Sequence, residues 1–115
     1  MRMKPETHRL MMTEWVAEFP FAYHTPPHGQ EVERGIRAYR NKGFDGSTPH
    51  IEKDFGMKDP KIIWLATKPE HTHSANKCLK IDLRKLDPAN LRLTYQAECN
   101  LWHLGDIPEE AIVRE

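Results

Sequence analysis

The centre of the chain has the sequence Ile62-Ile63-Trp64-Leu65-Ala66-Thr67-Lys68-Pro69-Glu70. Four apolar or aromatic residues run together, end at a small residue and a hydroxyl, and are followed by a Lys-Pro pair. A short apolar run that stops at a proline is typical of a buried strand with a turn at its end. We therefore expect a buried strand here, with the other informative segments arranged around it.

The first part of the chain predicts one helix and one strand. Apolar residues recur at spacings of three and four before Pro20, which indicates a helix from about residue 5 to residue 18. The aromatic residues 21–25 favour a strand, and Pro26 stops it because proline cannot donate to a strand ladder. The helix is expected to pack on the core, with binding of a partner as the alternative.

A second, surface helix is expected over residues 30–41. Val32, Ile36 and Tyr39 lie on one helical stripe, and Gly35 weakens the pattern slightly. Residues 44–60 show no sustained period and indicate a long loop with a turn of helix at 51–55, either a binding loop or a plain connection.

The second half of the chain is richer in strand patterns. A short helix is expected over residues 69–76 and a turn over 87–90. Alternating apolar residues predict two strands, 78–83 and 91–95, which we expect to be adjacent and antiparallel. Residues 100–104 and 111–113 are the last strand candidates. This order of elements argues for an α+β fold.

Composition limits the classes of protein to consider. The chain has 115 residues, which suits a single domain, and its 17 basic residues balance 17 acidic residues. No general basic field exists to attract nucleic acid. The apolar runs are too short to span a bilayer, and the N-terminus is not followed by a signal-peptide block. We expect no membrane partner and a cytoplasmic location.

Metal-binding and hydrolytic chemistry find little support in the motifs. His71, His73 and Cys78, with Cys99 or His103, are zinc-type ligands, but their spacing matches no strong zinc pattern. We therefore expect no metal. The chain also lacks a Gly-x-Ser-x-Gly motif and a glycine-rich phosphate loop.

Polar residues at the predicted strand ends are the remaining candidates. His24, Thr25, Thr67 and His103 can hydrogen-bond ribose hydroxyls, and aromatic residues such as Trp64 can stack on a base or nicotinamide ring. The alternative is that the histidines are satisfied polar residues on a half-exposed sheet. The spacing alone favours the second interpretation.

Four segments also share their order and spacing with a known family. They are Tyr23-His24-Thr25 with the helix and Gly43-Phe44 after it, then residues 63–70, residues 79–86 with Asp87-Pro88, and residues 102–112. In this order they resemble the motifs of the ADP-ribosyltransferase superfamily. The last segment is similar to that of the RNA 2′-phosphotransferase branch and of small uncharacterised relatives. The resemblance covers about residues 21–113.

The resemblance implies an ADP-ribosyltransferase-like split antiparallel β-sheet with flanking helices, and a cleft for NAD⁺ or a related ADP-ribosyl ligand. Within one domain of residues 1–115, residues 1–20 would be an N-terminal helical extension and 21–113 the core. His24 would bond the adenosine ribose, Trp64 would stack on nicotinamide, and Thr67 would line the pocket. The cofactor-binding set is completed by Tyr23, Thr25 and His103.

The implied function is NAD-dependent ADP-ribosyl transfer to a protein or nucleic-acid acceptor. Glu98 is the candidate catalytic carboxylate, because the transferases that modify proteins use a late glutamate. Gln96 stands where the phosphotransferase branch has its last arginine, and Lys61, not an arginine, precedes the central strand. These departures argue against removal of an RNA phosphate. The alternative is a non-catalytic nucleotide- or protein-binding module with the same fold.

Overall fold

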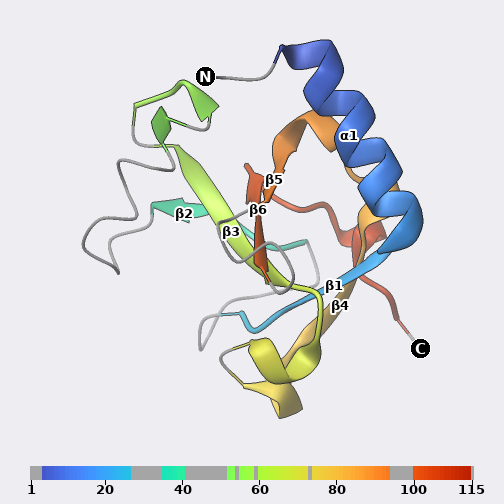
Figure 1. Cartoon of the computed structure of the whole chain (residues 1–115). Helices are drawn as coiled ribbons and strands as arrows, with labels where there is room; N and C mark the ends of the chain where they lie inside the picture. Colours follow the sequence, from blue (N-terminus) through green and yellow to red (C-terminus); the bar gives the residue numbers. More distant parts are fainter. Residues whose placement is uncertain are drawn as a thin grey trace.

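The computed structural model describes residues 4–26, 35–40, 52–53, 55–58, 60–72, 74–93 and 100–114 (Figure 1). Within these ranges the chain forms a long α-helix at the N-terminal side, a helical turn at residues 52, 53 and 55, and one six-stranded sheet. Every strand pair in the sheet is antiparallel. The order of sequence patterns therefore predicted the α+β class correctly. None of the described helices is long and apolar enough to cross a membrane.

The elements follow one another as a helix, three strands, two turns, a strand, two turns, two strands and a last turn. The helix and strands are α1 (Pro5–Glu18), β1 (Phe21–His24), β2 (Tyr39–Arg40), β3 (Lys61–Ala66), β4 (Leu79–Asp82), β5 (Leu91–Leu93) and β6 (Asn100–Leu104). Short 3₁₀ turns lie between and after them: η1 (Pro69–His71), η2 (Ala75–Lys77), η3 (Leu83–Lys85), η4 (Pro88–Asn90) and η5 (Glu109–Ala111).

The central strand predicted from the apolar run is β3, and the sheet order is β4-β1-β3-β6-β5. One edge of β3 pairs with β6 continuously from Ile62 to Ala66. Because a strand has only two edges, β1 and β2 must share the other edge. There β1 pairs only at Ala66 and β2 only at Lys61 and Ile62. In the described part of the chain, residues 63–65 therefore have no strand partner on this edge.

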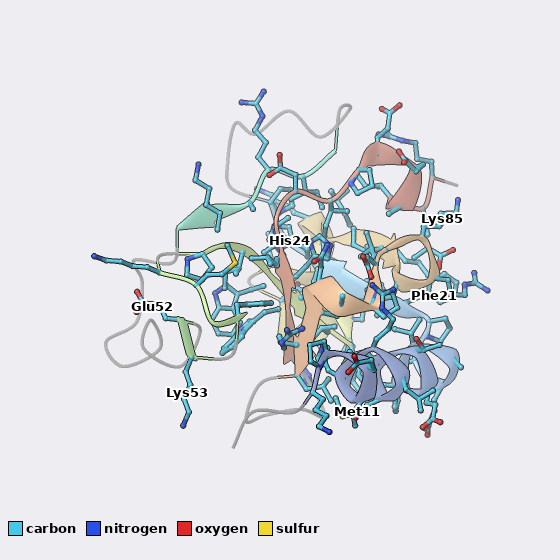
Figure 2. All side chains as sticks on the ribbon, turned by 90° about the horizontal axis from the view of Figure 1, so that it is seen from above. Met11, Phe21, His24, Glu52, Lys53 and Lys85 are labelled. Carbon is cyan, nitrogen blue, oxygen red and sulfur yellow. The ribbon has the colours of Figure 1, made fainter. Side chains whose placement is uncertain are left out.

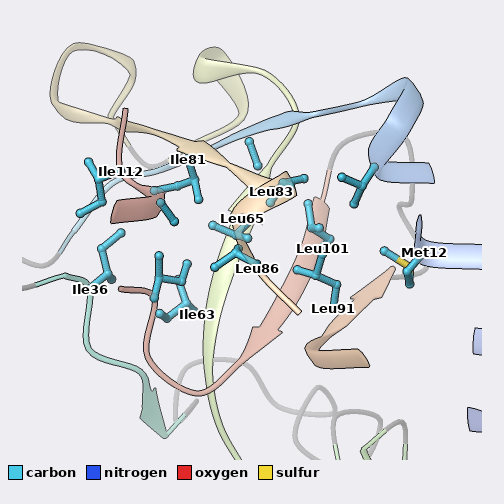
Figure 3. Close-up of a cluster of buried hydrophobic side chains, with 14 residues drawn as sticks. Met12, Ile36, Ile63, Leu65, Ile81, Leu83, Leu86, Leu91, Leu101 and Ile112 are labelled. Carbon is cyan, nitrogen blue, oxygen red and sulfur yellow. The ribbon is translucent and has the colours of Figure 1, made fainter. Parts of the chain in front are cut away.

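The main core lies on one face of the sheet, against α1. Met12 and Val16 of the helix are buried there. Burying one such side chain stabilises the folded protein by about 1.5–3 kcal/mol. Figure 3 shows the Met12 side chain beside a group of aliphatic side chains from the rest of the core. That group contains Ile36, Ile63, Leu65, Ile81, Leu83, Leu86, Leu91, Leu101 and Ile112.

A smaller aromatic cluster lies on the opposite face of the sheet. Trp64 of β3 and Trp102 of β6 stand directly opposite each other, with ring centroids 5.3 Å apart and planes at 88°. Ile62 and Trp102 are buried there, and Phe55 and Leu104 pack against them. Residues 52, 53 and 55 are helical, in agreement with the expected helical turn.

The prediction of a helix over residues 30–41 is wrong for residues 35–40, the part that the structure describes. Ile36 forms an isolated bridge with Ile107, with backbone N···O distances of 2.8 and 2.9 Å in the two directions. Tyr39 and Arg40 form β2, and the amide of Ala38 donates to the Asp106 side chain at 2.6 Å. These long-range pairings take the backbone groups that a helix would use, so tertiary contacts outweigh the helical stripe.

Two strands expected to be neighbours lie at opposite edges of the sheet. The strands predicted over 78–83 and 91–95 correspond to β4 and β5, and β1, β3 and β6 lie between them. Sequence proximity suggested a hairpin, but η3 and η4 fill the connection and pack against α1. The turn at 87–90 is confirmed, since Asp87 accepts a hydrogen bond from the Ala89 amide at 3.0 Å.

Two further elements are shorter than the sequence patterns indicated. The single helix expected over 69–76 is two separate 3₁₀ turns, η1 and η2. The strand expected over 111–113 is the end of η5 followed by one bridge between Ile112 and Ile81. Segments this short form few backbone hydrogen bonds of their own, so their conformation follows the neighbouring elements.

Gly35 and Gly105 allow a matched test of the unexpected Ile36–Ile107 contact. Both have positive φ, 97° and 82°. A Cβ at Gly35 would also overlap the Ile107 carbonyl oxygen, whereas one at Gly105 would meet nothing within 4 Å. We expect Gly105→Ala to lower the free energy of unfolding by about 1 kcal/mol, and Gly35→Ala by about 2–4 kcal/mol. Urea denaturation of both variants checks this, and equal losses would contradict the close backbone approach.

Candidate functional site

The gap in strand pairing along β3 is filled in part by the ring of His24. His24, labelled in Figure 2, is the last residue of β1. Its Nδ1 lies 2.7 Å from the Trp64 carbonyl oxygen. Trp64 lies between the two points where β1 and β2 pair with β3. A carbonyl oxygen only accepts, so Nδ1 carries the proton. The histidine side chain therefore continues the hydrogen bonding of β3 where no described strand does so.

This bond leaves the second ring nitrogen of His24 as an acceptor. His24 is only 3% exposed, and its Nε2 has no hydrogen-bond partner among the described residues. Burial lowers the pKa of the ring, and the bond to Trp64 opposes this only partly. The neutral ring therefore presents a buried lone pair, which needs an N–H or O–H donor to be satisfied.

Thr25, just after the end of β1, forms two hydrogen bonds within the protein. Its hydroxyl donates to the Ser74 carbonyl at 2.9 Å and accepts from the Ser74 amide at 3.0 Å. The only hydroxyl proton is thus used inside the protein. Thr25, predicted to bind cofactor, holds the segment around η2 against the end of β1. Ser74 was not singled out by the sequence, because a serine in a polar turn carries no distinguishing pattern.

Tyr23 and Trp64 lie on the sheet face opposite the main core. Tyr23 stands opposite Ala66, which shares a face with Trp64, and both aromatic residues are half-buried. Alternation along β1 places His24 on the other face, together with the buried Ala22. The rings of His24 and Trp64 therefore lie on opposite faces of the sheet.

The remaining predicted site residues have different positions. Thr67 follows β3 directly, is half-buried and interacts within the protein. His103 lies in β6, opposite Ile63, so that β3 separates it from β1. Its Nδ1 donates to the Gly105 carbonyl at 2.8 Å, and burial lowers its pKa. Glu98, the predicted catalytic carboxylate, lies outside the described residues.

The zinc-type ligands can be followed only in part. His71 is exposed in η1 and Cys78 is half-buried just before β4. His73 and Cys99 lie outside the described residues, and no group of three metal-binding side chains occurs among the residues that are described.

A surface hollow of about 430 Å³ lies away from these residues. It is lined by Glu109, Glu110, Ile112 and Arg114.

No family model, curated protein or solved structure matches this chain.

The buried histidines predict how stability changes with pH. The pKa values of His24 and His103 are lowered in the folded protein, so the unfolded chain binds more protons as the pH falls through about 6.5. The free energy of unfolding should therefore decrease between about pH 6.5 and 5, by up to about 1.4 kcal/mol per pH unit for each histidine. Urea denaturation across this range measures the slope.

His24→Gln provides the matched variant for the pH experiment. It should remove the share of His24 from the slope, because glutamine does not titrate. An unchanged slope in this variant, or a flat profile in the wild type, would contradict a neutral buried ring.

The metal prediction has a direct measurement. Elemental analysis of purified protein should find well under one zinc per chain, because the spacing of the candidate ligands fits no established zinc pattern. Stoichiometric zinc, together with unfolding by a chelator, would contradict this prediction.

Proposed function

We propose that the chain binds NAD⁺ or a related ADP-ribosyl compound at the gap beside β3, and transfers ADP-ribose to a protein or nucleic-acid acceptor. The observation that carries the proposal is the unpaired Nε2 of His24, buried next to a strand edge that lacks a partner among the described residues. The order of the sequence motifs supports an ADP-ribosyltransferase-like split sheet around this gap.

The protonation state of His24 selects the kind of group it can recognise. A neutral Nε2 accepts hydrogen bonds, so it binds a hydroxyl or an amide N–H and gives no bond to a fully ionised phosphate oxygen. A ribose presents such hydroxyls. Because the ring is also held by its bond to the Trp64 carbonyl, the acceptor is oriented before any ligand arrives. These features favour a sugar hydroxyl as the partner of Nε2.

Trp64 provides the aromatic surface in the proposal. Its ring is half-buried and is held edge-on by Trp102, which restricts its orientation. Tyr23 lies on the same face of the sheet. In the proposal, the nicotinamide end of the ligand lies on the Trp64 face and the adenosine ribose bonds His24 at the end of β1.

The chemistry needs one group beyond these residues. In ADP-ribosyl transfer the bond from ribose C1′ to the nicotinamide nitrogen breaks, a bond from C1′ to the acceptor nucleophile forms, and the acceptor proton is released. Positive charge develops on the ribose, and a carboxylate placed there would stabilise it. The motif resemblance assigns this carboxylate to Glu98. His24 stays neutral and holds the adenosine ribose.

Binding without transfer is the second candidate. Gln96 and Lys61 stand where the resemblance implies arginines. The missing arginines favour a nucleotide-binding module that lacks catalytic groups.

The binding half of the proposal is tested with His24→Ala. Loss of one neutral hydrogen bond costs about 0.5–1.5 kcal/mol, so the affinity for NAD⁺ or ADP-ribose should fall by about two- to twelvefold in calorimetric titration. His8→Ala is the matched control. His8 is also buried and hydrogen-bonds a backbone carbonyl, that of Leu91, but it lies on α1. Equal effects of both variants, or no binding by the wild type at millimolar ligand, would contradict the site.

The catalytic half is tested by nicotinamide release. Glu98→Gln should abolish release and leave ligand affinity nearly unchanged, because its charge acts mainly in the transition state. Trp64→Phe keeps a ring and most of the volume, and it should weaken binding while removing the ligand-induced quenching of tryptophan fluorescence. A wild-type protein that binds the ligand and never releases nicotinamide would leave the binding module as the function.

A further inference from the structure

The helix α1 has apolar side chains on its outer side as well as on the side that it buries. Met12 and Val16 pack in the main core, whereas Leu10 is 61% exposed and Phe19, just after the helix, is 41% exposed. Figure 1 shows α1 along the outside of the molecule. Single exposed apolar residues are common on proteins, so these two are informative only if they belong to one surface.

Met11, Trp15 and Phe19 form one row along α1, because residues four positions apart lie on the same side of a helix. Met11 and Trp15 are half-buried and pack against the edge of the main core. The ring centroids of Trp15 and Phe19 lie 4.9 Å apart, with planes at 35°. We call these three residues the apolar row. It leads from the edge of the core to the exposed ring of Phe19.

A second row runs beside the apolar row and carries negative charge. It contains Leu10, Glu14 and Glu18, each one position before a member of the apolar row, and all three are exposed. We call these residues the acidic row. Within the part of the chain that the structure describes, no Lys or Arg forms an ion pair with Glu14 or Glu18. The two rows together place exposed carboxylates next to an apolar strip.

The end of the helix does not favour these carboxylates. The C-terminal end of an α-helix carries a partial negative charge, which cations stabilise. The last turn of α1 contains Glu18 and no basic residue. Two cations lie on η3, which contacts α1, but both act on Asp82: Arg84 bonds it at 2.9 Å, and Lys85 helps to lower its pKa. A cation from outside the chain would therefore find an unmatched negative charge here.

A second copy of this chain fits the surface poorly. Two-fold pairing places the same surface of each copy against itself. It would bring Glu14 and Glu18 of both copies into one interface, and neither row contains a Lys or Arg. Like charges at an interface reduce affinity. A partner that carries both apolar side chains and cations matches the two rows better, and an amphipathic helix presents both groups along its length.

We propose that the apolar and acidic rows of α1 form a docking surface for a basic amphipathic helix of a partner protein. The apolar side chains of the partner lie on Trp15 and Phe19, and its Lys or Arg side chains pair with Glu14 and Glu18. Binding leaves the buried side of α1 in the core. The surface contains neither His24 nor Trp64, so it does not depend on the proposed function.

A model peptide tests this surface. The probe is an amphipathic peptide with leucine on one helical face and lysine on the other, and the control peptide has glutamate in place of lysine. In fluorescence-anisotropy titration at low salt, where exposed ion pairs are least screened, the wild-type chain should bind the lysine peptide and not the glutamate peptide. Absence of binding to the lysine peptide, or equal binding of both peptides, would overturn the proposal.

The contribution of the acidic row is measured with Glu14→Gln and Glu18→Gln combined in one chain. Loss of two exposed ion pairs should weaken binding of the lysine peptide about tenfold. The matched control combines Glu109→Gln and Glu110→Gln, because these glutamates are also exposed but lie in η5. The control removes the same charge and should change the affinity less than about twofold. Equal losses in the two double variants would show attraction by net charge alone and would overturn the docking surface.

The contribution of the apolar side chains is measured with Phe19→Ser, which should weaken binding of the lysine peptide about fivefold or more. Met57→Ser is the matched control, because Met57 is 48% exposed and lies outside α1. Its affinity should stay close to that of the wild type. Leu10→Ser covers the case in which Phe19→Ser does not fold, since Leu10 is the more exposed of the two, and it should also weaken binding. Equal affinities of the α1 variants and the Met57 variant would contradict the proposal.

Sedimentation of the wild-type chain alone separates a partner from a second copy. The chain should stay monomeric as its concentration rises, because two acidic rows repel each other. A concentration-dependent dimer that Phe19→Ser abolishes and Met57→Ser retains would show that a second copy occupies the surface, and the basic partner would be wrong.

Discussion

A buried strand must have its backbone hydrogen bonds completed on both edges, and β3 meets this requirement unequally. β6 pairs with one edge from Ile62 to Ala66, whereas β1 and β2 reach only the two ends of the other. An unpaired carbonyl inside a sheet costs free energy comparable to a lost hydrogen bond. The ring of His24 bonds the Trp64 carbonyl between those ends, so a side chain completes part of the ladder.

This use of His24 would link stability to the proposed ligand binding. The proton on Nδ1 is committed to the backbone, and burial favours the neutral ring. The remaining lone pair on Nε2 is therefore fixed in direction, and it has no partner among the described residues. An unsatisfied buried acceptor is a cost in the free protein, and a ligand hydroxyl would remove that cost. Thr25 has a structural role, because its hydroxyl proton is donated to the Ser74 carbonyl.

Local patterns predicted the elements that depend on one face or one run of residues. The bounds of α1 agree with its apolar periodicity, and β1, β3 and β6 agree with short aromatic or aliphatic runs. At residues 35–40 the apolar spacing predicts a helix, and this prediction is wrong because Ile36 pairs with Ile107. Gly35 weakens a helix, but it is the residue that permits positive φ and a close backbone contact.

The sequence by itself determined the α+β class, the central strand and the types of residue that end the strands, because hydrophobic periodicity and proline act locally. Only the tertiary structure decided that β4 and β5 lie at opposite edges, that His103 is separated from His24 by β3, and that Thr25 bonds Ser74. These relations join residues far apart in the chain. They depend on which strand edges pair, and edge pairing is settled by packing of the whole sheet rather than by any one segment.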